Sequence, residues 1–219
     1  MPRPTDPPLQ NVYDVLREHF GPQHWWPADG PDEVVIGAIL VQNTAWANAV
    51  KAIDQLKRRA ALDWRVLHET PVDRLAGWIR PAGCYNRKAR QLKAFAACII
   101  KEHGGRLERL FEAPDEQLRE RLLAIWGIGL ETADCILLYA AGRPVFVVDT
   151  YTRRLMTRHN WAGADNAYEV LSRIFTLQLQ GDTEQYNEFH ALIVELGKQY
   201  CRAKPLCEAC PLKRFLPKQ

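Results

Sequence analysis

Residues 122–134 read LLAIWGIGLETAD, with two glycines separated by a single isoleucine. An apolar helix is expected to end near Trp126, and Gly127 and Gly129 let the chain reverse before a second helix begins near Leu130. The first N–H groups of that second helix have no partner within the helix, and the helix dipole adds partial positive charge there. The segment therefore predicts two helices joined by a tight hairpin, which serves either as a phosphate-binding turn or as a plain connection.

The rest of the chain predicts an all-α fold. Apolar residues recur at helical spacing along 12–20 and 189–196, and residues 34–41 are apolar nearly all round, as in a helix at the centre of a helical domain. Residues 145–148 read as extended, but four residues make no sheet. Further helices are expected at 45–60, 71–79, 87–103, 115–124, 131–142, 150–158 and 166–179.

Composition and charge limit the classes of protein to consider. The 219 residues are 47% hydrophobic and 25% charged, which excludes a disordered chain. The net charge is 29 − 26 = +3, too small by itself to indicate a nucleic-acid binder. Cations gather within 80–93 and 198–219, either as DNA-facing patches or as solvated basic faces. Since neither an apolar run of about 20 residues nor a signal peptide is seen, we expect a cytoplasmic protein.

A single carboxylate stands out in the second half of the chain. Residues 147–154 read VVDTYTRR, so Asp149 lies where an extended apolar segment passes into a helix. An aspartate at this place can cap the helix by accepting a hydrogen bond from one of its first N–H groups. It can also serve as a catalytic carboxylate, and the two roles are compatible.

Together these segments resemble the helix-hairpin-helix DNA glycosylases of the endonuclease III superfamily, over nearly the whole chain. The resemblance implies two helical lobes with a substrate cleft between them, one formed by residues 29–143 and the other by 1–28 with 144–219. It implies that Asp149 is the catalytic residue. In the segment ILVQNT at 39–44, Gln42 or Asn43 is expected to enter the DNA stack. The residues expected to contact the DNA backbone are Arg87, Lys88, Gly127, Gly129 and Thr132.

The residue at the start of the second hairpin helix bears on the reaction. Bifunctional members of the resembled family carry a lysine there, because an amine is needed to attack the sugar and form a Schiff base. This chain has Glu131, and a carboxylate cannot form an imine. The resemblance therefore implies hydrolytic base removal without strand cleavage. Glu131 lines the pocket or simply stabilises the first turn of its helix.

Three tryptophans flank the apolar helix at 34–41: Trp25 and Trp26 precede it and Trp46 follows it. Tryptophans are ordinarily core residues. The pattern, with Glu131, is similar to the 3-methyladenine DNA glycosylase III branch of the superfamily. An alkylated purine is a cation that stacks well between indoles, and its charge makes the base a good leaving group. We therefore expect these residues to line an alkylpurine pocket.

The C-terminal region contains Cys201, Cys207 and Cys210, with metal-site spacing. The resembled family binds a 4Fe-4S cluster here with four cysteines, and the place of the fourth is taken by Leu216. Either the cluster has an incomplete or exogenous fourth ligand, or a remote residue supplies that ligand, or the loop has lost its metal. His190, near the last apolar helix, could orient Asp149, but a lone histidine near an apolar face is more often a core residue, and it is not part of the expected catalytic set.

The function expected from the sequence is a monofunctional glycosylase of base excision repair, acting as a monomer on damaged double-stranded DNA in a bacterial or archaeal nucleoid. The alternatives within enzymes are a glycosylase for uracil, for a thymine mismatch, or for adenine opposite oxidised guanine, and an endonuclease III-like enzyme with residual activity at abasic sites. Neutral bases such as these call for hydrogen-bond reading, which tryptophans supply poorly. A non-enzymatic DNA binder would not need Asp149, and a redox sensor built on the cysteines would not need the hairpin.

Overall fold

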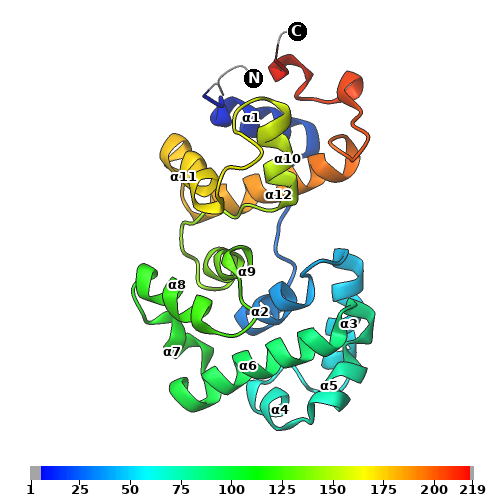
Figure 1. The fold of residues 1–219 in the computed structure, drawn as a ribbon, viewed down its shortest axis with the longest axis vertical. Coiled ribbons are helices and arrows are strands. Elements are labelled where there is room, and N and C mark those ends of the chain that lie inside the picture. Colours follow the sequence, from blue (N-terminus) through cyan, green and yellow to red (C-terminus); the bar gives the residue numbers. More distant parts are fainter. Residues whose placement is uncertain (1–5, 218–219) are drawn as a thin grey trace. The chain divides into compact units, whose positions relative to one another are not determined.

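The computed structural model describes residues 6–217, and helices are the only regular secondary structure within that range (Figure 1). The prediction of an all-α fold is confirmed. The chain divides into two units, one formed by Ala28–Arg143 and the other by the described residues up to Pro27 together with those from Pro144 onward.

The unit Ala28–Arg143 is built around the apolar helix α2, in which every residue from Glu33 to Leu40 is buried. Helix α2 packs against α3, α6, α9 and the π-helical turn η2. Its elements are α2 (Pro31–Leu40), α3 (Trp46–Lys57), α4 (Trp64–Glu69), α5 (Val72–Trp78), η1 (Arg80–Ala82), α6 (Tyr85–His103), α7 (Leu107–Phe111), α8 (Asp115–Ala124), α9 (Leu130–Cys135) and η2 (Ile136–Ala140).

In the second unit, α12 forms the centre and packs against α1 and α10. Phe146 of the segment before α10 stacks on Phe175 with ring centroids 3.8 Å apart, and Phe189 of α12 meets both rings edge-on. The elements of this unit are α1 (Leu9–Phe20), α10 (Thr150–Arg158), α11 (Tyr168–Leu179), α12 (Thr183–Gln199), η3 (Cys207–Ala209) and η4 (Lys213–Phe215).

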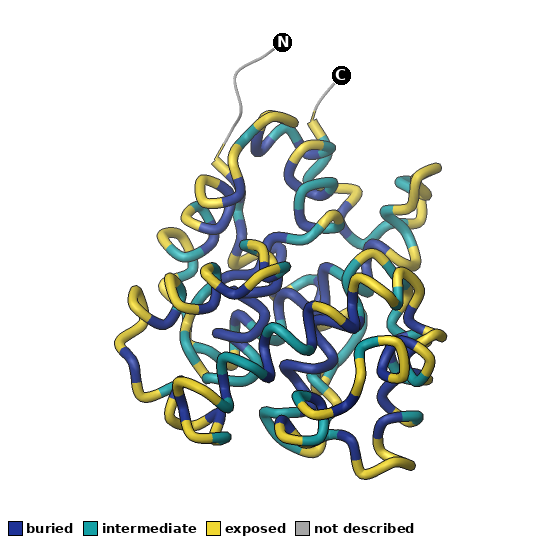
Figure 2. The backbone as a smooth tube through the Cα atoms, turned by 60° about the horizontal axis from the view of Figure 1, so that its bottom comes forward, coloured by how far each residue is buried: buried dark blue, intermediate teal, exposed yellow. Residues whose placement is uncertain are grey.

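The expected helices form, with shifts at their ends, and most of them carry both buried and exposed positions (Figure 2). Two short helices, α4 and α7, were not expected, because five or six residues are too few to show a helical period. The expected helix 131–142 is α9 followed by η2, and residues 145–148 form no strand. Among the described residues, no helix is long and apolar enough to cross a membrane.

Candidate DNA-binding and catalytic site

The hairpin between α8 and α9 is closed by residues 125–129. Gly127 has φ +85°, a left-handed conformation that favours glycine, and Ile128 N–H donates to the carbonyl of Ile125 at 3.1 Å. Gly129 differs, with φ −98° and no atom within 4 Å of the position that a Cβ would occupy. Packing within the chain thus requires a glycine at 127 but not at 129, where the missing Cβ leaves room for a partner outside the chain.

A buried glutamine holds this hairpin to the rest of its unit. Gln91 of α6 is fully buried, and its Nε2 donates to the carbonyl oxygen of Gly127 at 2.7 Å and to Oε1 of Gln42 at 2.8 Å. Gln42 in turn donates through Nε2 to Oγ1 of Thr132 at 3.0 Å. Gln91 was not among the predicted site residues, although a glutamine on the apolar face of α6 is a usable signal, because buried polar groups are almost always hydrogen-bonded.

An ion pair joins the two hairpin helices. Arg119 of α8 meets Asp134 of α9 with Nε 2.8 Å from Oδ1 and NH2 3.3 Å from Oδ2. The Asp134 side chain is 1% exposed, so its carboxylate is almost completely withdrawn from solvent and is paired with this arginine. The angle between α8 and α9 is thereby fixed by side chains outside the glycine turn.

Gln42 and Asn43, the two residues predicted to insert into DNA, lie in the turn after α2 and differ in exposure and in hydrogen bonding. Gln42 is engaged with Gln91 and Thr132. Asn43 is exposed in a left-handed conformation with φ +53°. Of the two, Asn43 has the side chain that projects from the surface, and Thr132 is buried beneath Gln42.

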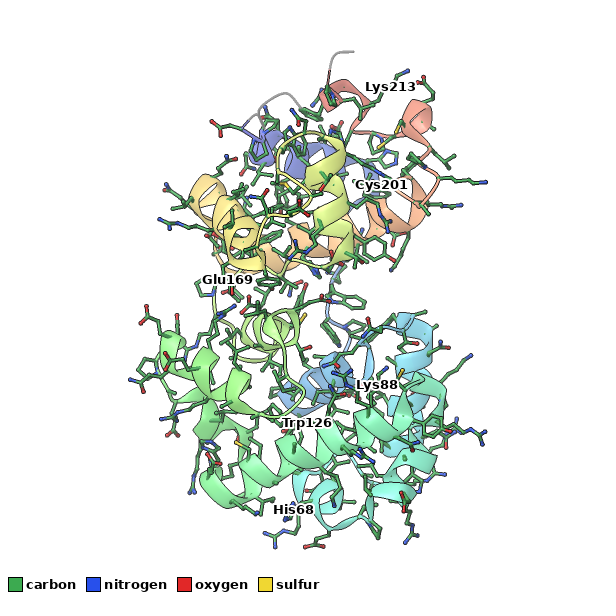
Figure 3. All side chains as sticks on the ribbon, viewed as in Figure 1. His68, Lys88, Trp126, Glu169, Cys201 and Lys213 are labelled. Carbon is green, nitrogen blue, oxygen red and sulfur yellow. The ribbon has the colours of Figure 1, made fainter. Side chains whose placement is uncertain are left out.

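Arg87 and Lys88, the two cations predicted to contact the DNA backbone, are adjacent in the first turn of α6 but differ in exposure. Arg87 is exposed on the first turn. Lys88 is 2% exposed, and its Nζ donates to the carbonyl oxygens of Leu40 at 2.8 Å and Ala82 at 2.7 Å (Figure 3). The expected phosphate contact by Lys88 does not fit this position, because its ammonium group caps the end of α2 from inside. Burial lowers the pKa of Lys88 from its ordinary value.

An aromatic residue beside the hairpin was not predicted as part of the site. Trp126 is 55% exposed and directly precedes Gly127 (Figure 3). An indole left this open to solvent is unusual, because tryptophan is among the more buried residue types on average. In the sequence, Trp126 marks only the expected end of an apolar helix.

Asp149 lies at the N-terminus of α10 and caps it. Its Oδ1 accepts a hydrogen bond from Thr152 N–H at 2.7 Å. Its Oδ2 lies 3.7 Å from Nε2 of His190, and the Asp149 side chain is 13% exposed. One carboxylate oxygen is thus held by the backbone, and the other faces an imidazole.

His190 belongs to α12 and is buried. Burial lowers its pKa from the ordinary value, and the neighbouring Asp149 acts in the opposite direction. Burial therefore favours the neutral form of this imidazole beside the carboxylate. The structure brings together the two residues that the sequence could connect only as a possibility.

The remaining predicted pocket residues lie in different units. Trp25 and Trp26 stand before Pro27, partly exposed, with ring centroids 5.0 Å apart and planes tilted by 53°. Trp46 opens α3 of the unit Ala28–Arg143 and is also partly exposed. Glu131 is exposed in the first turn of α9.

The three C-terminal cysteines line one cavity. Cys201, Cys207 and Cys210 are all partly buried, and Leu216 lines the same cavity. Arg158 of α10 donates from NH1 to Sγ of Cys201 at 3.2 Å. Burial raises the pKa of the Cys210 thiol, and the other two cysteines act in the same direction. The three cysteines therefore border one shared cavity.

A second group with metal-binding residue types lies at the end of α6. Ligand atoms of Cys98, Glu102 and His103 all lie within 4.8 Å of one another. Burial raises the pKa of the Cys98 thiol to about 11. The positive charge of Arg121 acts on both Cys98 and His103 and opposes a cation at this place.

Comparison with known proteins places this geometry in a family. Residues 36–179 match the family model described as "HhH-GPD superfamily base excision DNA repair protein". A protein of Methanocaldococcus jannaschii described as "Putative DNA repair glycosylase MJ1434" is 44% identical over 208 residues, covering 94% of each chain.

Two solved structures are similar over most of the chain. One is the H. pylori 3-methyladenine DNA glycosylase MagIII bound to 1,N6-ethenoadenine, with 28% identity, a TM-score of 0.77 and coverage of 87% of this chain and 97% of that one. The other is an endonuclease III–DNA complex, with 23% identity, a TM-score of 0.81 and coverage of 97% and 95%, which shows the fold. The hairpin, the capped aspartate and these comparisons agree: the chain belongs to the HhH-GPD superfamily of base excision DNA repair proteins, as a DNA glycosylase with the two-lobe helix-hairpin-helix fold.

Proposed function

We propose that this glycosylase is monofunctional and hydrolyses the N-glycosidic bond of alkylated purines such as 3-methyladenine in double-stranded DNA. The observation that carries the proposal is the placement of Asp149, a little-exposed carboxylate with one oxygen fixed by Thr152 and the other directed toward His190. It supplies one preoriented negative charge, which can stabilise the positive charge that develops on the sugar as the alkylated base leaves.

In the proposed reaction, Asp149 acts on the deoxyribose and on water. As the glycosidic bond breaks, positive charge develops on the sugar, and a fixed carboxylate stabilises it most when water is excluded by the extruded nucleotide. The oxygen that does not cap α10, Oδ2, is the one free of backbone hydrogen bonding to orient the attacking water. The electron pair of the glycosidic bond leaves with the purine, which departs as a neutral base because it was alkylated.

A lyase step would need an amine nucleophile, and neither Glu131 nor Lys88 supplies one. Glu131 occupies the exposed first turn of α9 and offers only a carboxylate. Lys88 has a lowered pKa, as a Schiff-base lysine would, but its ammonium group is buried against two carbonyl oxygens. We therefore propose that the product is an intact abasic site.

The choice of an alkylated purine rests on the indoles. Trp25 and Trp26 form a pair of partly exposed rings, and Trp46 is a third. A cationic purine gains cation–π and stacking energy on such rings, on the order of 1–3 kcal/mol per base for stacking, whereas a neutral base gains less. The similar H. pylori protein is itself named as a 3-methyladenine DNA glycosylase.

DNA is held, in this proposal, by the hairpin and its neighbours. The open space at Gly129 lets a phosphate approach the N–H groups that begin α9. Arg87 adds a charge contact, and Trp126 adds an apolar surface beside the hairpin. Asn43 is the residue we propose to fill the gap left by the flipped base, with Gln42 supporting it from the network with Gln91.

The cysteine cavity fits an iron–sulfur cluster as far as three ligands are concerned. Three cysteines line one cavity. The chain is also 28% identical over 187 residues to an endonuclease III of Thermotoga maritima. We propose that Cys201, Cys207 and Cys210 hold a 4Fe-4S cluster, which would act as a structural crosslink for the basic C-terminal segment. The enzyme is proposed to act as a monomer.

The experiment is a panel of duplexes of one sequence that carry 3-methyladenine-type alkylation, uracil, a thymine mismatch, or adenine opposite oxidised guanine. Free base is measured in single turnover, with Asp149→Asn as the control for contaminating activities. The proposal expects the alkylated duplex to be processed at least about tenfold faster than the others, a difference of about 1.4 kcal/mol. Faster release of uracil, thymine or adenine would overturn the alkylpurine assignment and leave Asp149 chemistry intact.

A further inference from the structure

The cysteine cavity lacks one ligand for a four-iron cluster. Leu216 takes the place of the fourth cysteine and lines the cavity with an aliphatic side chain that cannot coordinate iron. The other side chains that line it include Arg158 and Lys213, whose guanidinium and ammonium groups have no lone pair to coordinate iron, and the phenol of Tyr200. His159 also lines the cavity, and its imidazole is the one common transition-metal ligand among the lining residues besides the cysteines.

The hydrogen bond that His159 makes at Nδ1 leaves its other ring nitrogen, Nε2, able to bind a metal. Nδ1 lies 3.0 Å from the carbonyl oxygen of Phe215. Because a carbonyl oxygen can only accept a hydrogen bond, Nδ1 is the nitrogen that carries the proton, and the lone pair of the neutral ring is on Nε2. A metal-binding histidine typically donates its other ring N–H to a backbone carbonyl in this way. The His159 residue is 6% exposed and stacks on Trp161 with centroids 4.4 Å apart, which fixes the ring.

We propose that Nε2 of His159 is the fourth protein ligand of a 4Fe-4S cluster whose other ligands are Cys201, Cys207 and Cys210. The inference rests on the proposed cluster and assigns it a ligand set of three thiolates and one imidazole. Histidine replaces cysteine on iron in other iron–sulfur centres, so the donor type is chemically sound.

The spacing of the thiols favours a cluster over a single zinc ion. At a tetrahedral zinc site with Zn–S bonds of about 2.3 Å, the sulfur atoms would lie about 3.8 Å apart. Among the described residues, the only group of three ligand atoms within 4.8 Å of one another is Cys98, Glu102 and His103. At least one pair of the C-terminal thiols is therefore farther apart than the sulfur atoms of a single zinc site would be.

The same contacts tie the cysteine loop to the helix that carries Asp149. Arg154 of α10 donates to the carbonyl of Cys201 at 2.8 Å, and Arg158 donates to those of Arg202 at 2.7 Å and Ala203 at 3.1 Å. Helix α10 begins after Asp149 and ends next to His159. A ligand at its C-terminal end would thus fix both ends of α10, one to the proposed cluster and the other to the proposed reaction centre.

The test uses the full chain reconstituted anaerobically with iron and sulfide. We expect about four irons per chain, visible absorbance, and in the reduced cluster a hyperfine coupling to a nitrogen nucleus detected by pulsed EPR. His159→Cys should keep the iron and lose the nitrogen coupling. His159→Ala should lose iron, to about three per chain or fewer, and adding Leu216→Cys to that variant should restore it, since the family's fourth cysteine is then present.

The matched control is His103→Ala, which removes a buried histidine from the other unit and should change neither iron content nor the nitrogen coupling. Melting curves of each variant show whether it folds. Full iron content and an unchanged EPR spectrum in folded His159→Ala would overturn the assignment of His159 and leave the cluster standing. A wild-type chain that takes up no iron but releases alkylated bases would overturn the cluster and this inference, while the proposed reaction would stand.

Discussion

Gln91 and Gly127 are in direct contact: Nε2 of Gln91 donates to the Gly127 carbonyl at 2.7 Å, and a Cβ added at 127 would collide with Cγ of Gln91. Gly127→Ala must therefore displace a buried side chain and accept a left-handed backbone, at a cost of about 1–3 kcal/mol of stability. We expect its melting temperature to fall by several degrees. An unchanged melting temperature would contradict this packing.

Gly129→Ala is the matched variant two positions away. Its Cβ would meet nothing within 4 Å and its φ of −98° suits alanine, so stability should be unchanged. If DNA phosphate approaches this backbone, the methyl group should weaken binding of an abasic-site duplex at least about tenfold. Fluorescence anisotropy measures this, and equal affinity of wild type and variant would remove the hairpin from the proposed DNA contact.

The fold was predictable from sequence because apolar residues at helical spacing and glycines at the ends of helices are local signals. Of the site, some residues were predictable and others were not. Lys88 and Arg87 are adjacent cations and look alike in sequence, yet only the backbone geometry of α6 turns Lys88 toward Leu40 and leaves Arg87 exposed. Gln91 and His190 gain their roles from partners 36 and 41 residues away, Gly127 and Asp149, and such pairings carry no signal in the local pattern.

Replacing Trp25, Trp26 and Trp46 one at a time by alanine tests whether each indole binds the base or belongs to the core. If Trp25, Trp26 or Trp46 stacks on a cationic base, its variant should lose about one to two decades in kcat/KM and keep its melting temperature. A core tryptophan would instead cost about 3–5 kcal/mol of stability. Thermal melts and base release on the three variants distinguish these results. Normal processing of alkylated purines by all three would remove the physical support for the alkylpurine pocket.

Borohydride trapping tests the absence of an amine nucleophile. Because Glu131 cannot form an imine and Lys88 is buried, we expect no covalent complex with alkylated DNA and product strands that break only after alkali treatment. An endonuclease III run in parallel provides the positive control for trapping. A trapped complex with this chain would show that another amine performs lyase chemistry.

The stability of the fold should decrease in mild acid. Burial lowers the pKa of His190, which faces Asp149, and of His103, which lies near Glu102 and Arg121. The unfolded chain therefore binds protons first as the pH falls below about 6.5, and the stabilisation present above that pH is lost progressively toward the folded-state pKa values.

Urea unfolding at pH 7.5 and 5.5 measures this loss. His190→Gln and His103→Gln should each reduce the difference between the two pH values, because each removes one group that protonates on unfolding. A wild-type protein equally stable at both pH values would contradict the assignment of these histidines as buried and neutral.

The role of Asp149 can be measured most directly by single-turnover base release from an alkylated duplex with Asp149→Asn beside the wild type. The asparagine keeps an oxygen that can cap α10 and removes the negative charge, so folding and DNA affinity should be retained. We predict that base release falls by several orders of magnitude, since the charge that stabilises the sugar cation is gone. Release at the wild-type rate by the folded, DNA-bound variant would contradict the account.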